Sequence, residues 1–454
     1  MPRVPTRLCS QILAFAGVFG LAGCNNYELF RVAGYEQVSF SNDAEIIFII
    51  DNSASMQEEA TDLALNFTTF IDTLTDTQNG GGLETNSLSD AVRNYIRYTS
   101  ERGRYIDYQL GITTTSVEVP ESNPNLPGVY GELVGDPTLI QDTDVSIAGP
   151  FIQNLLCEST CWNDSFLPAD PTYECRRVPD DPSTIDAQPA QISIDYLNCL
   201  CGFEEWTGHC GSGNEEQLES AVMAMCRAVE DPPEECYDGT PFTDSAILTN
   251  EGMLRPNSTV IFVIITDEGD TSRRLANGED DPQDYIDLLD LFGVRYRFAV
   301  VGPNYDYEAG TLNCNSGGAT IWGSRRLQLA AEYTNGFYNS IAEEGAGGDC
   351  PNSDFSQHLD DLGQLLLGLQ QSFPLQSYPD IDTIVAYVNG ENVPQGYLDP
   401  EASEAQGTEV YTDGWTYEAS TNSVYFHGNT VPDYNAEVDI YYKPLEGTPR
   451  TLPF

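Results

Sequence analysis

The sequence predicts an α/β protein with a doubly wound, mainly parallel sheet and a small all-β domain at its carboxyl end. Residues 46–50 and 260–265 are unbroken apolar runs rich in β-branched side chains, as in parallel strands buried on both faces. Over residues 44–373 strand patterns alternate with helix patterns, which is typical of a parallel sheet covered by helices on both faces. Over residues 374–454 short apolar segments lie between Asn-Gly and Pro turns without a helix pattern, which predicts a sandwich-like domain.

The individual elements follow from the periodicity of apolar side chains. Behind the strand at residues 45–50, apolar residues from Met56 to Leu74 recur at steps of three and four, which predicts an amphipathic helix that ends near Thr75. Further strands are expected over residues 105–115, 259–266, 296–302 and 336–341, and further helices over residues 88–98, 218–225, 285–292, 327–333 and 358–373. In the carboxyl-terminal domain, strands are expected over residues 383–390, 414–417, 423–426 and 436–442.

The charge balance is strongly acidic. The chain has 454 residues with 19 Lys and Arg against 71 Asp and Glu, a formal net charge of −52. Such a surface repels nucleic acid and anionic lipid, so we expect no nucleic-acid partner. Either adaptation to high salt or the collection of divalent cations explains this composition, and the composition alone does not separate the two.

The amino terminus predicts export. Arg3 and Arg7 precede a short apolar run that ends in Leu-Ala-Gly-Cys24, the pattern of a signal peptide over residues 1–23. These last four residues resemble a bacterial lipobox, which implies that Cys24 carries lipid, that residues 24–43 are a tether, and that the protein is anchored to the outer membrane or cell surface of a bacterium. The alternative is an ordinary signal peptide that happens to contain a cysteine. No later stretch reaches the 18 or so apolar residues of a spanning helix.

Ten of the twelve cysteines remain once Cys9 and Cys24 are set aside. In an oxidising compartment they predict up to five disulfides, whose connectivity the sequence leaves open. Residues 117–210 are rich in proline, poor in periodicity, and hold six of the ten. We interpret this segment as an insertion that lies over the ligand-bearing edge of the sheet, pinned by disulfides because it lacks a large core of its own.

Polar side chains follow the two most apolar strands. Asp51, Ser53 and Ser55 come directly after the first, and Asp267 follows the second. Because the carboxyl ends of parallel strands meet at one edge of a sheet, these side chains are expected to converge there. Carboxylates and hydroxyls are hard oxygen ligands that suit Mg²⁺, Ca²⁺ or Mn²⁺. The alternative for Asp51 and Ser53 is a simple helix cap.

The pattern Asp51-x-Ser53-x-Ser55 after an apolar strand resembles the metal-ion-dependent adhesion site of von Willebrand factor type A domains, and Thr266-Asp267-Glu268 is similar to the Thr-Asp-Gly of that family. The resemblance covers residues 44–373 and implies that Asp267 acts through a water. The family threonine that completes the metal site is missing, and Ser212 or Glu215 is expected to replace it. An equally good alternative is that these two residues form a capping box.

This resemblance implies a surface lipoprotein that binds a protein or glycan through a divalent cation, with an acidic group of the ligand completing the metal shell. An alternative is an envelope component whose cation is purely stabilising. A metal-dependent hydrolase is a weaker alternative, because the sequence shows no Gly-x-Ser-x-Gly motif and no histidine-based dyad, and Ser53 occupies the position of a second phosphotransfer aspartate. We therefore expect no enzyme activity.

Overall fold

We describe the protein from a computed structural model. The residues that the structure describes are 36–40, 43–75, 107–117, 129–144, 146–162, 167–175, 191–202, 210–211, 214–238, 240, 242–255, 258–272, 281–314, 320–343, 351–369, 372–375, 377–400, 403, 410–419, 422–432, 436 and 438–445. The expected signal peptide, Cys24, Ser212 and the helix expected over 88–98 lie outside these ranges.

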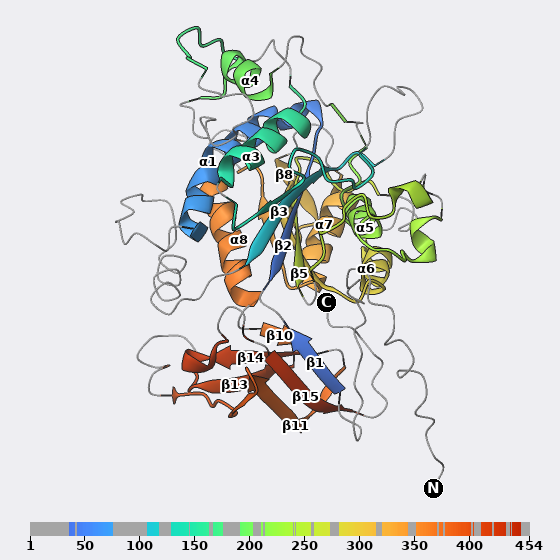
Figure 1. Ribbon diagram of the computed structural model, residues 1–454, viewed down its shortest axis with the longest axis vertical. Helices are drawn as coiled ribbons and strands as arrows, with labels where there is room; N and C mark the ends of the chain where they lie inside the picture. The colour runs from blue at the N-terminus through green and yellow to red at the C-terminus, as the bar shows by residue number, and fades with distance from the viewer. Residues whose placement is uncertain are drawn as a thin grey trace, which may run out of the picture.

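The central sheet is mixed and mainly parallel, as predicted (Figure 1). Its order is β4-β3-β2-β5-β6-β9, in which only β4 runs antiparallel to its neighbour. The strands are β2 (Ala44–Ile50), β3 (Tyr108–Thr114), β4 (Leu139–Gln141), β5 (Thr259–Ile265), β6 (Arg295–Gly302) and β9 (Phe337–Ser340). The two apolar runs of the sequence, β2 and β5, are adjacent and pair in register from Ala44–Thr259 to Ile50–Ile265.

Successive side chains of β2 enter two different hydrophobic clusters, because side chains alternate across a strand. Phe48 packs with α1 (Gln57–Thr75), α3 (Ala148–Gln153) and α8 (Phe355–Leu369). Ile47 packs with α5 (Gln217–Cys226), α6 (Gln283–Asp290) and α7 (Ile321–Tyr333). Both faces of the sheet are therefore covered around β2, which explains why β2 and β5 are nearly continuous apolar runs.

Shorter elements complete this part of the chain. They are α4 (Ile194–Cys201), the hairpin of β7 (Asn304–Asp306) and β8 (Thr311–Cys314), a π-helical turn (Asn154–Glu158), and the 3₁₀ turns η1 (Ala54–Met56), η5 (Glu234–Cys236) and η6 (Asp244–Ala246). A further 3₁₀ turn, η7 (Gly428–Thr430), lies in the carboxyl-terminal part.

The segment expected to be an insertion contributes to the main core. Phe151 of α3 stacks on Phe67 of α1 with 3.6 Å between ring centroids and meets Phe48 edge-on at 4.9 Å. Three disulfides tie the segment together: Cys157–Cys201, Cys161–Cys210 and Cys175–Cys199. A fourth, Cys226–Cys236, closes a short loop, and Cys314 is also disulfide-bonded. The prediction of disulfides is thus confirmed.

The carboxyl-terminal strands form two antiparallel sheets below the central sheet in Figure 1. One has the order β1-β15-β11-β12, with β1 (Glu36–Phe40), β15 (Val438–Pro444), β11 (Pro379–Val388) and β12 (Glu391–Val393); the other is β10 (Ser372–Pro374), β14 (Ser423–His427) and β13 (Gly414–Glu418).

Two expectations for these strands differ from the structure. Residues 36–40 fall within the expected tether but form β1, which pairs with β15 along its whole length. The helix expected over 358–373 ends at Leu369, and Phe373 instead belongs to β10, where it packs edge-on against Phe426 at 5.2 Å.

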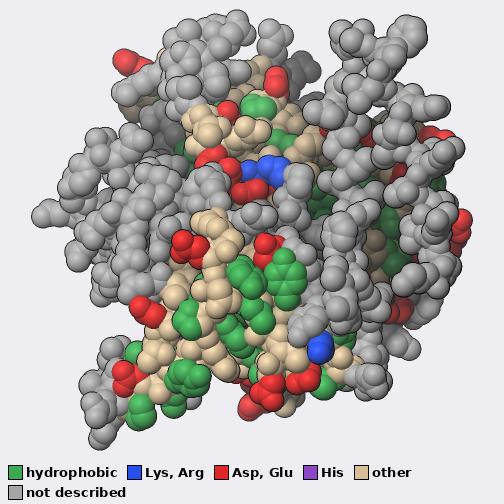
Figure 2. Space-filling view, turned by 60° about the horizontal axis from the view of Figure 1, so that its bottom comes forward, with side chains coloured by type: hydrophobic (Ala, Val, Ile, Leu, Met, Phe, Trp, Pro, Cys, Tyr) green, Lys and Arg blue, Asp and Glu red, His purple; other side chains and the backbone are tan. Residues whose placement is uncertain are grey.

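Several large apolar side chains of the carboxyl-terminal part remain exposed. Figure 2, in which the lower end of the molecule is turned toward the viewer, shows hydrophobic side chains interspersed with acidic ones on this face. Among the described residues of this part, the exposed large apolar side chains are Tyr378, Ile381, Tyr397, Leu398 and Leu445.

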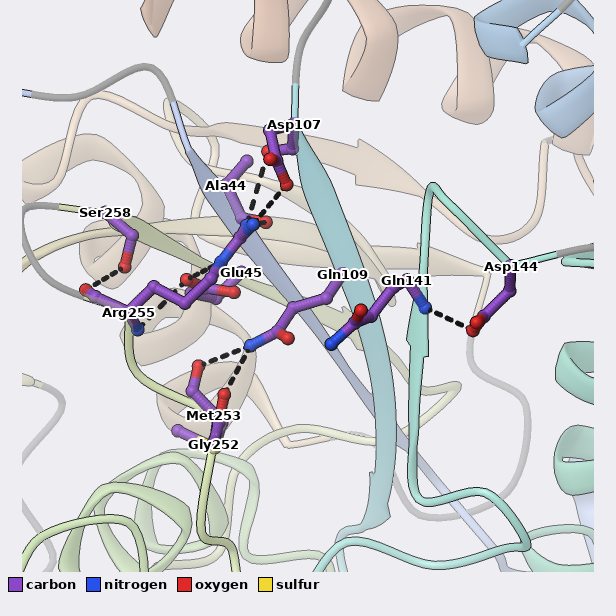
Figure 3. A network of polar contacts seen from close by, with 10 residues as sticks. All are labelled: Ala44, Glu45, Asp107, Gln109, Gln141, Asp144, Gly252, Met253, Arg255 and Ser258. Carbon is purple, nitrogen blue, oxygen red and sulfur yellow. Dashed lines mark hydrogen bonds and ion pairs between the residues drawn. The ribbon is translucent and has the colours of Figure 1, made fainter. Parts of the chain in front are cut away.

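Arg255 joins the amino-terminal ends of β2 and β3 (Figure 3). Its Nε donates to Glu45 Oε1 at 2.8 Å, its Nη1 pairs with Asp107, and its Nη2 donates to the carbonyl oxygen of Ala44 at 3.1 Å. Glu45 is completely buried, and burial raises the pKa of its carboxyl while Arg255 opposes that rise. The guanidinium is therefore the group that makes an ionised carboxylate tolerable inside the sheet.

We expect Arg255→Met to lower the free energy of unfolding by about 3 kcal/mol, because it leaves Glu45 buried without its partner. Chemical denaturation measures this loss. Adding Glu45→Gln to the first substitution should restore more than half of it, since an amide carries no charge. A loss below about 1 kcal/mol for the single variant would show that the ion pair is not important for stability.

Candidate metal-binding site

The parallel ladder extends beyond the strands and places three side chains side by side. Asp51 N donates to the carbonyl oxygen of Ile265, Thr115 N to that of Ile50, and Thr266 N to that of Val301, each at 3.0 Å. Asp51, Thr115 and Thr266 thus occupy the same edge of neighbouring strands, the edge at which open α/β sheets bind ligands.

Asp51 is buried, with 1% of its surface exposed. Its Oδ2 accepts a hydrogen bond from Thr266 Oγ1 at 2.7 Å, and its Oδ1 accepts one from Ser53 N at 2.8 Å. Burial raises the pKa of the Asp51 carboxyl, while these hydrogen bonds act in the opposite direction. Both of these hydrogen-bond donors, the Thr266 hydroxyl and the Ser53 backbone N–H, are uncharged, and they fix the orientation of the Asp51 carboxylate.

The two serines connect Asp51 to Asp267. Ser53 Oγ lies 2.9 Å from Ser55 Oγ, and Ser55 Oγ donates to Asp267 Oδ1 at 3.1 Å. The side chain of Ser53 makes no capping hydrogen bond to the 3₁₀ turn that follows it. The four residues Asp51, Ser53, Ser55 and Asp267 therefore come together as the sequence predicts, although Asp51 and Asp267 lie 216 positions apart by number.

Glu215 reaches the same site from the segment before α5. Thr115 Oγ1 donates to Glu215 Oε2, and Thr271 holds the carbonyl oxygen of Glu215 through its N at 2.7 Å and its Oγ1 at 2.9 Å. Glu215 is completely buried, and its Oε1 has no hydrogen-bond partner among the described atoms. The helix begins at Gln217, two residues after Glu215. Ser212, the other expected substitute, lies outside the described residues.

The carboxyl groups of the site influence one another strongly. Burial raises the pKa of Glu215 to about 10, with the negative charge of Asp51 as the next cause. Burial followed by the charge of Asp51 also raises the pKa of Asp267 to about 7 and raises that of Glu268. These groups stand close enough together for one negative charge to oppose the next.

One acid at the site was missed from the sequence. Glu59 lies in the first turn of α1, is 8% exposed, and its Oε2 has no hydrogen-bond partner within the described part of the chain. Burial raises its pKa to about 7, and its charge acts on Asp267. The only signal was its four-residue step from Ser55, which places both on one side of the helix start. An acid in a first helical turn is otherwise ordinary.

Asp270 also lies in the loop after β5, but both of its carboxylate oxygens already have partners. Its Oδ2 accepts from Arg326 Nη1 at 2.7 Å, and its Oδ1 accepts from Ser272 Oγ at 2.7 Å and from Leu218 N at 3.1 Å. Both members of the ion pair are completely buried. This pair joins α7 to the loop that carries Asp267 and to the start of α5, and so fixes the position of the site.

The donor set suits a hard divalent cation. Among the described residues no group of three or more His, Cys, Asp or Glu side chains is placed to hold a metal ion. The side chains that come together here are carboxyls and hydroxyls. The buried side chains of Glu215 and Asp51 contact each other, and Glu215 Oε1 has no hydrogen-bond donor among the described atoms. This observation fits a cation, because two buried carboxylates in contact need a positive charge or a proton between them. Oxygen-only ligands match Mg²⁺, Ca²⁺ or Mn²⁺.

A serine–histidine contact that the sequence did not suggest lies elsewhere. Ser353 Oγ is 2.6 Å from His358 Nε2, and Asn339 Nδ2 is 3.2 Å from His358 Nδ1 and 2.7 Å from Asp361 Oδ2. The Asn339 side-chain NH₂ donates one hydrogen to Asp361 and the other to His358 Nδ1. Because Nδ1 is the acceptor, the proton of the neutral imidazole is on Nε2. Ser353 in turn donates to the carbonyl oxygen of Ile341. The imidazole faces Ser353 as a donor, so this arrangement does not provide a base for a nucleophile.

Comparisons with known proteins give weak likenesses. No protein-family model matches the chain, and no curated protein matches it. Among solved structures it is similar to a von Willebrand factor type A protein from Catenulispora acidiphila, at 10% identity over 91% of this chain and 62% of that one, with a TM-score of 0.28. It is also similar to the pilus adhesin RrgA from Streptococcus pneumoniae, at 10% identity over 91% of this chain and 60% of that one, with a TM-score of 0.27.

A third similar structure is proximal thread matrix protein 1 from the mussel byssus, at 12% identity over 75% of this chain and 52% of that one, with a TM-score of 0.28. The chain thus spans about three fifths or less of the length of these structures. Likenesses this weak carry no conclusion about function. In the helices that the structure describes, no segment has the length and apolar character needed to cross a membrane.

The raised pKa values predict how stability depends on pH when no cation is present. Between the ordinary carboxyl pKa of about 4 and the raised values of about 7 for Asp267 and Glu59, the folded chain holds protons that the unfolded chain has released. The unfolding free energy therefore falls as the pH rises through this window, and Glu215 extends the fall toward about pH 10.

Thermal melts in chelator from about pH 5 to about pH 8 should show this fall, and saturating Mg²⁺ or Ca²⁺ should flatten it because a cation favours the ionised carboxylates. Sodium chloride at matched ionic strength is the control. Equal slopes in chelator and in divalent cation would mean that these acids do not bind the ion.

Proposed function

We propose that the protein binds a ligand through a divalent cation held at the edge of the sheet by Asp51, Ser53, Ser55 and Glu215, with Asp267 acting through a water. The observation that carries this proposal is the buried contact between the side chains of Asp51 and Glu215, together with the absence of a hydrogen-bond donor to Glu215 Oε1 among the described atoms. The cation would supply a Lewis-acidic position for an oxygen atom of the ligand.

Hydrogen bonds from the surrounding residues orient the carboxylates of the proposed site. Thr266 and the backbone N of Ser53 orient the two oxygens of Asp51, and Thr115 orients Glu215. Ser55 bonds to Asp267 and so places the second aspartate next to the serine pair. These uncharged donors hold the carboxylate oxygens of Asp51 and Glu215 in position before the ion binds. Such preorganisation raises the affinity for the ion, because the protein does not have to rearrange on binding.

We further propose that this site belongs to a von Willebrand factor type A domain, doubly wound, and that the segment around 117–210 borders the ligand. The support is residue by residue: Asp51-x-Ser53-x-Ser55 and Asp267 converge, and Cys161–Cys210 places Gly211 beside the motif, where Gly211 N donates to the carbonyl oxygen of Asn52 at 2.9 Å. The ligand would be a protein or a glycan, and the family resemblance implies that it offers an acidic group.

We propose that the chain is exported and held at the outer membrane or cell surface by lipid on Cys24. The disulfides support an oxidising compartment. In Figure 1 the strands that include β1 lie at the opposite end of the molecule from the start of α1, which marks the edge with Asp51. An anchor just before β1 would therefore present the cation site away from the membrane.

Asp51→Ala should reduce the affinity for Mg²⁺, Ca²⁺ or Mn²⁺ at least about tenfold while the fold persists, because it removes one direct ligand at the end of a strand whose core is unchanged. Isothermal titration with each metal ion alone measures the loss, and circular dichroism checks the fold. Asp382→Ala, at an exposed position of β11, is the matched control. If Asp51→Ala binds the ions as the unaltered protein does, the site is elsewhere.

The lipid anchor has its own test. Expressed in a bacterium with its full amino terminus, the chain should incorporate labelled palmitate and enter the membrane fraction, and Cys24→Ser should abolish both. Cys9→Ser is the control, because Cys9 lies within the expected signal. Release of the unaltered chain into the soluble fraction, without label, would refute the anchor and would leave the cation site untouched.

A further inference from the structure

Glu215 changes the charge of the proposed cation site, and this inference rests on that site. A divalent cation has two positive charges. Asp51 and Glu215 are both buried and lie at one edge of the sheet. There, Thr115 N donates to the carbonyl oxygen of Ile50, next to Asp51, and Thr115 Oγ1 donates to Glu215. With a cation bound, the two carboxylates would together supply two negative charges. An ion held between them would already be neutralised before any ligand arrives.

The position of Glu215 is fixed on both sides. Thr115 donates to its Oε2, and Thr271 holds its backbone carbonyl oxygen with two hydrogen bonds. The next residue is tied as well, because Glu216 N donates to the carbonyl oxygen of Thr115 at 3.0 Å. The carboxylate is therefore part of the built site and is not free to turn away when a ligand approaches.

Further negative charge surrounds the pair. Asp267 accepts a hydrogen bond from Ser55 at 3.1 Å. Glu268 N donates to Thr266 Oγ1 at 3.1 Å, and the same hydroxyl donates to Asp51 at 2.7 Å. Arg326, which contacts the loop after β5, is already paired with Asp270 in a buried contact. A ligand that enters here would therefore meet an ion whose charge is already balanced by Asp51 and Glu215, with further carboxylates nearby.

We propose that Glu215 sets the ligand class, so that the open position of the cation accepts an uncharged oxygen, such as a hydroxyl or an amide carbonyl, and rejects a carboxylate. A carboxylate would bring a third negative charge into contact with a neutralised ion and would be repelled by Asp267 and Glu268. A neutral oxygen meets no such repulsion, and Ca²⁺ in particular accepts neutral oxygens readily. This replaces the acidic ligand that the family resemblance implies.

The test counts the waters on bound Mn²⁺, a divalent probe, by the relaxation of water protons. Each protein is loaded with Mn²⁺ and titrated at constant ionic strength with acetate, with acetamide and with a methyl glycoside that has a vicinal diol. In the unaltered protein acetamide or the glycoside should displace water and acetate should not. In Glu215→Thr and Glu215→Gln, acetate should bind at least about tenfold more tightly than in the unaltered protein, because one negative charge has left the ion.

Glu391→Gln, the same chemical change at an exposed position of β12, should behave as the unaltered protein does. Glu215→Gln keeps the shape of the side chain and an acceptor for Thr115, so thermal melts should show that it folds. Displacement of water by acetate in the unaltered protein, as readily as in Glu215→Thr, would overturn the inference. Absence of Mn²⁺ binding to the unaltered protein is a different result, which would overturn the proposed function itself.

The three probes also separate the sources of a neutral oxygen. Displacement by acetamide alone indicates an amide carbonyl, as a protein ligand offers, and displacement by the glycoside alone indicates a diol, as a glycan offers. Either supports the proposal. Displacement by neither, with acetate active, overturns it.

Discussion

The contact between the buried carboxyl groups of Asp51 and Glu215 is the interaction on which the rest of this edge depends. Two like charges that face each other out of water repel strongly, and neutral donors reduce this cost only in part. Thr266, Thr115 and the backbone of Ser53 supply such donors, and all three come from positions next to strand ends. The pair can persist at neutral pH with a bound proton or with a bound cation.

The surrounding fold keeps these two acids from separating. β2 and β3 bring Asp51 and Thr115 to the same edge through the parallel ladder, while Glu215 is held by Thr271 in the loop after β5. That loop packs tightly on α7: a Cβ at Gly269 would lie 2.7 Å from Ser324 N, so a larger residue there would push the loop outward. The buried pair of Asp270 and Arg326 joins the same two elements. The acids are thus positioned by the core of the sheet, not by a mobile surface loop.

The features of the site that depend on local sequence patterns were predictable, and those that depend on contacts far along the chain were not. The strands before Asp51 and Asp267 were visible because burial on both faces leaves a continuous apolar run, and parallel pairing then brings their ends together. The choice between Ser212 and Glu215 was not, because it depends on a loop whose course is set by contacts with Thr115 and Thr271 far along the chain. Phe151 was missed for the same reason: its partner Phe67 lies outside its own segment.

The same limit applies to local patterns that tertiary pairing overrides. Residues 36–40 carry no strong strand periodicity, and β1 forms because β15 offers an edge to it. The disulfide pairs could not be derived, since ten cysteines allow many connectivities and only the folded chain brings particular ones together. Glu59 was hidden because an acid in a first helical turn is expected for the helix dipole alone.

The location of the positive charges bears on why the chain is so acidic. Arg255 compensates Glu45 and Asp107 at one end of the sheet, and Arg326 compensates Asp270 near the other. The carboxyls of Asp51, Glu215 and Asp267 have no such partner among their described contacts; the charged groups that act on them are acids.

Adaptation to high salt accounts for exposed carboxylates, because dissolved ions screen charges at the surface. It does not account for buried ones, which mobile ions screen far less. The completely buried Glu215, with an oxygen left unbonded in the described structure, is therefore beyond the reach of bulk salt, and its charge must be met by a bound proton or by a bound cation. The high-salt explanation therefore applies to the exposed carboxylates alone, and the acids at this edge of the sheet are governed by the buried contacts that hold them.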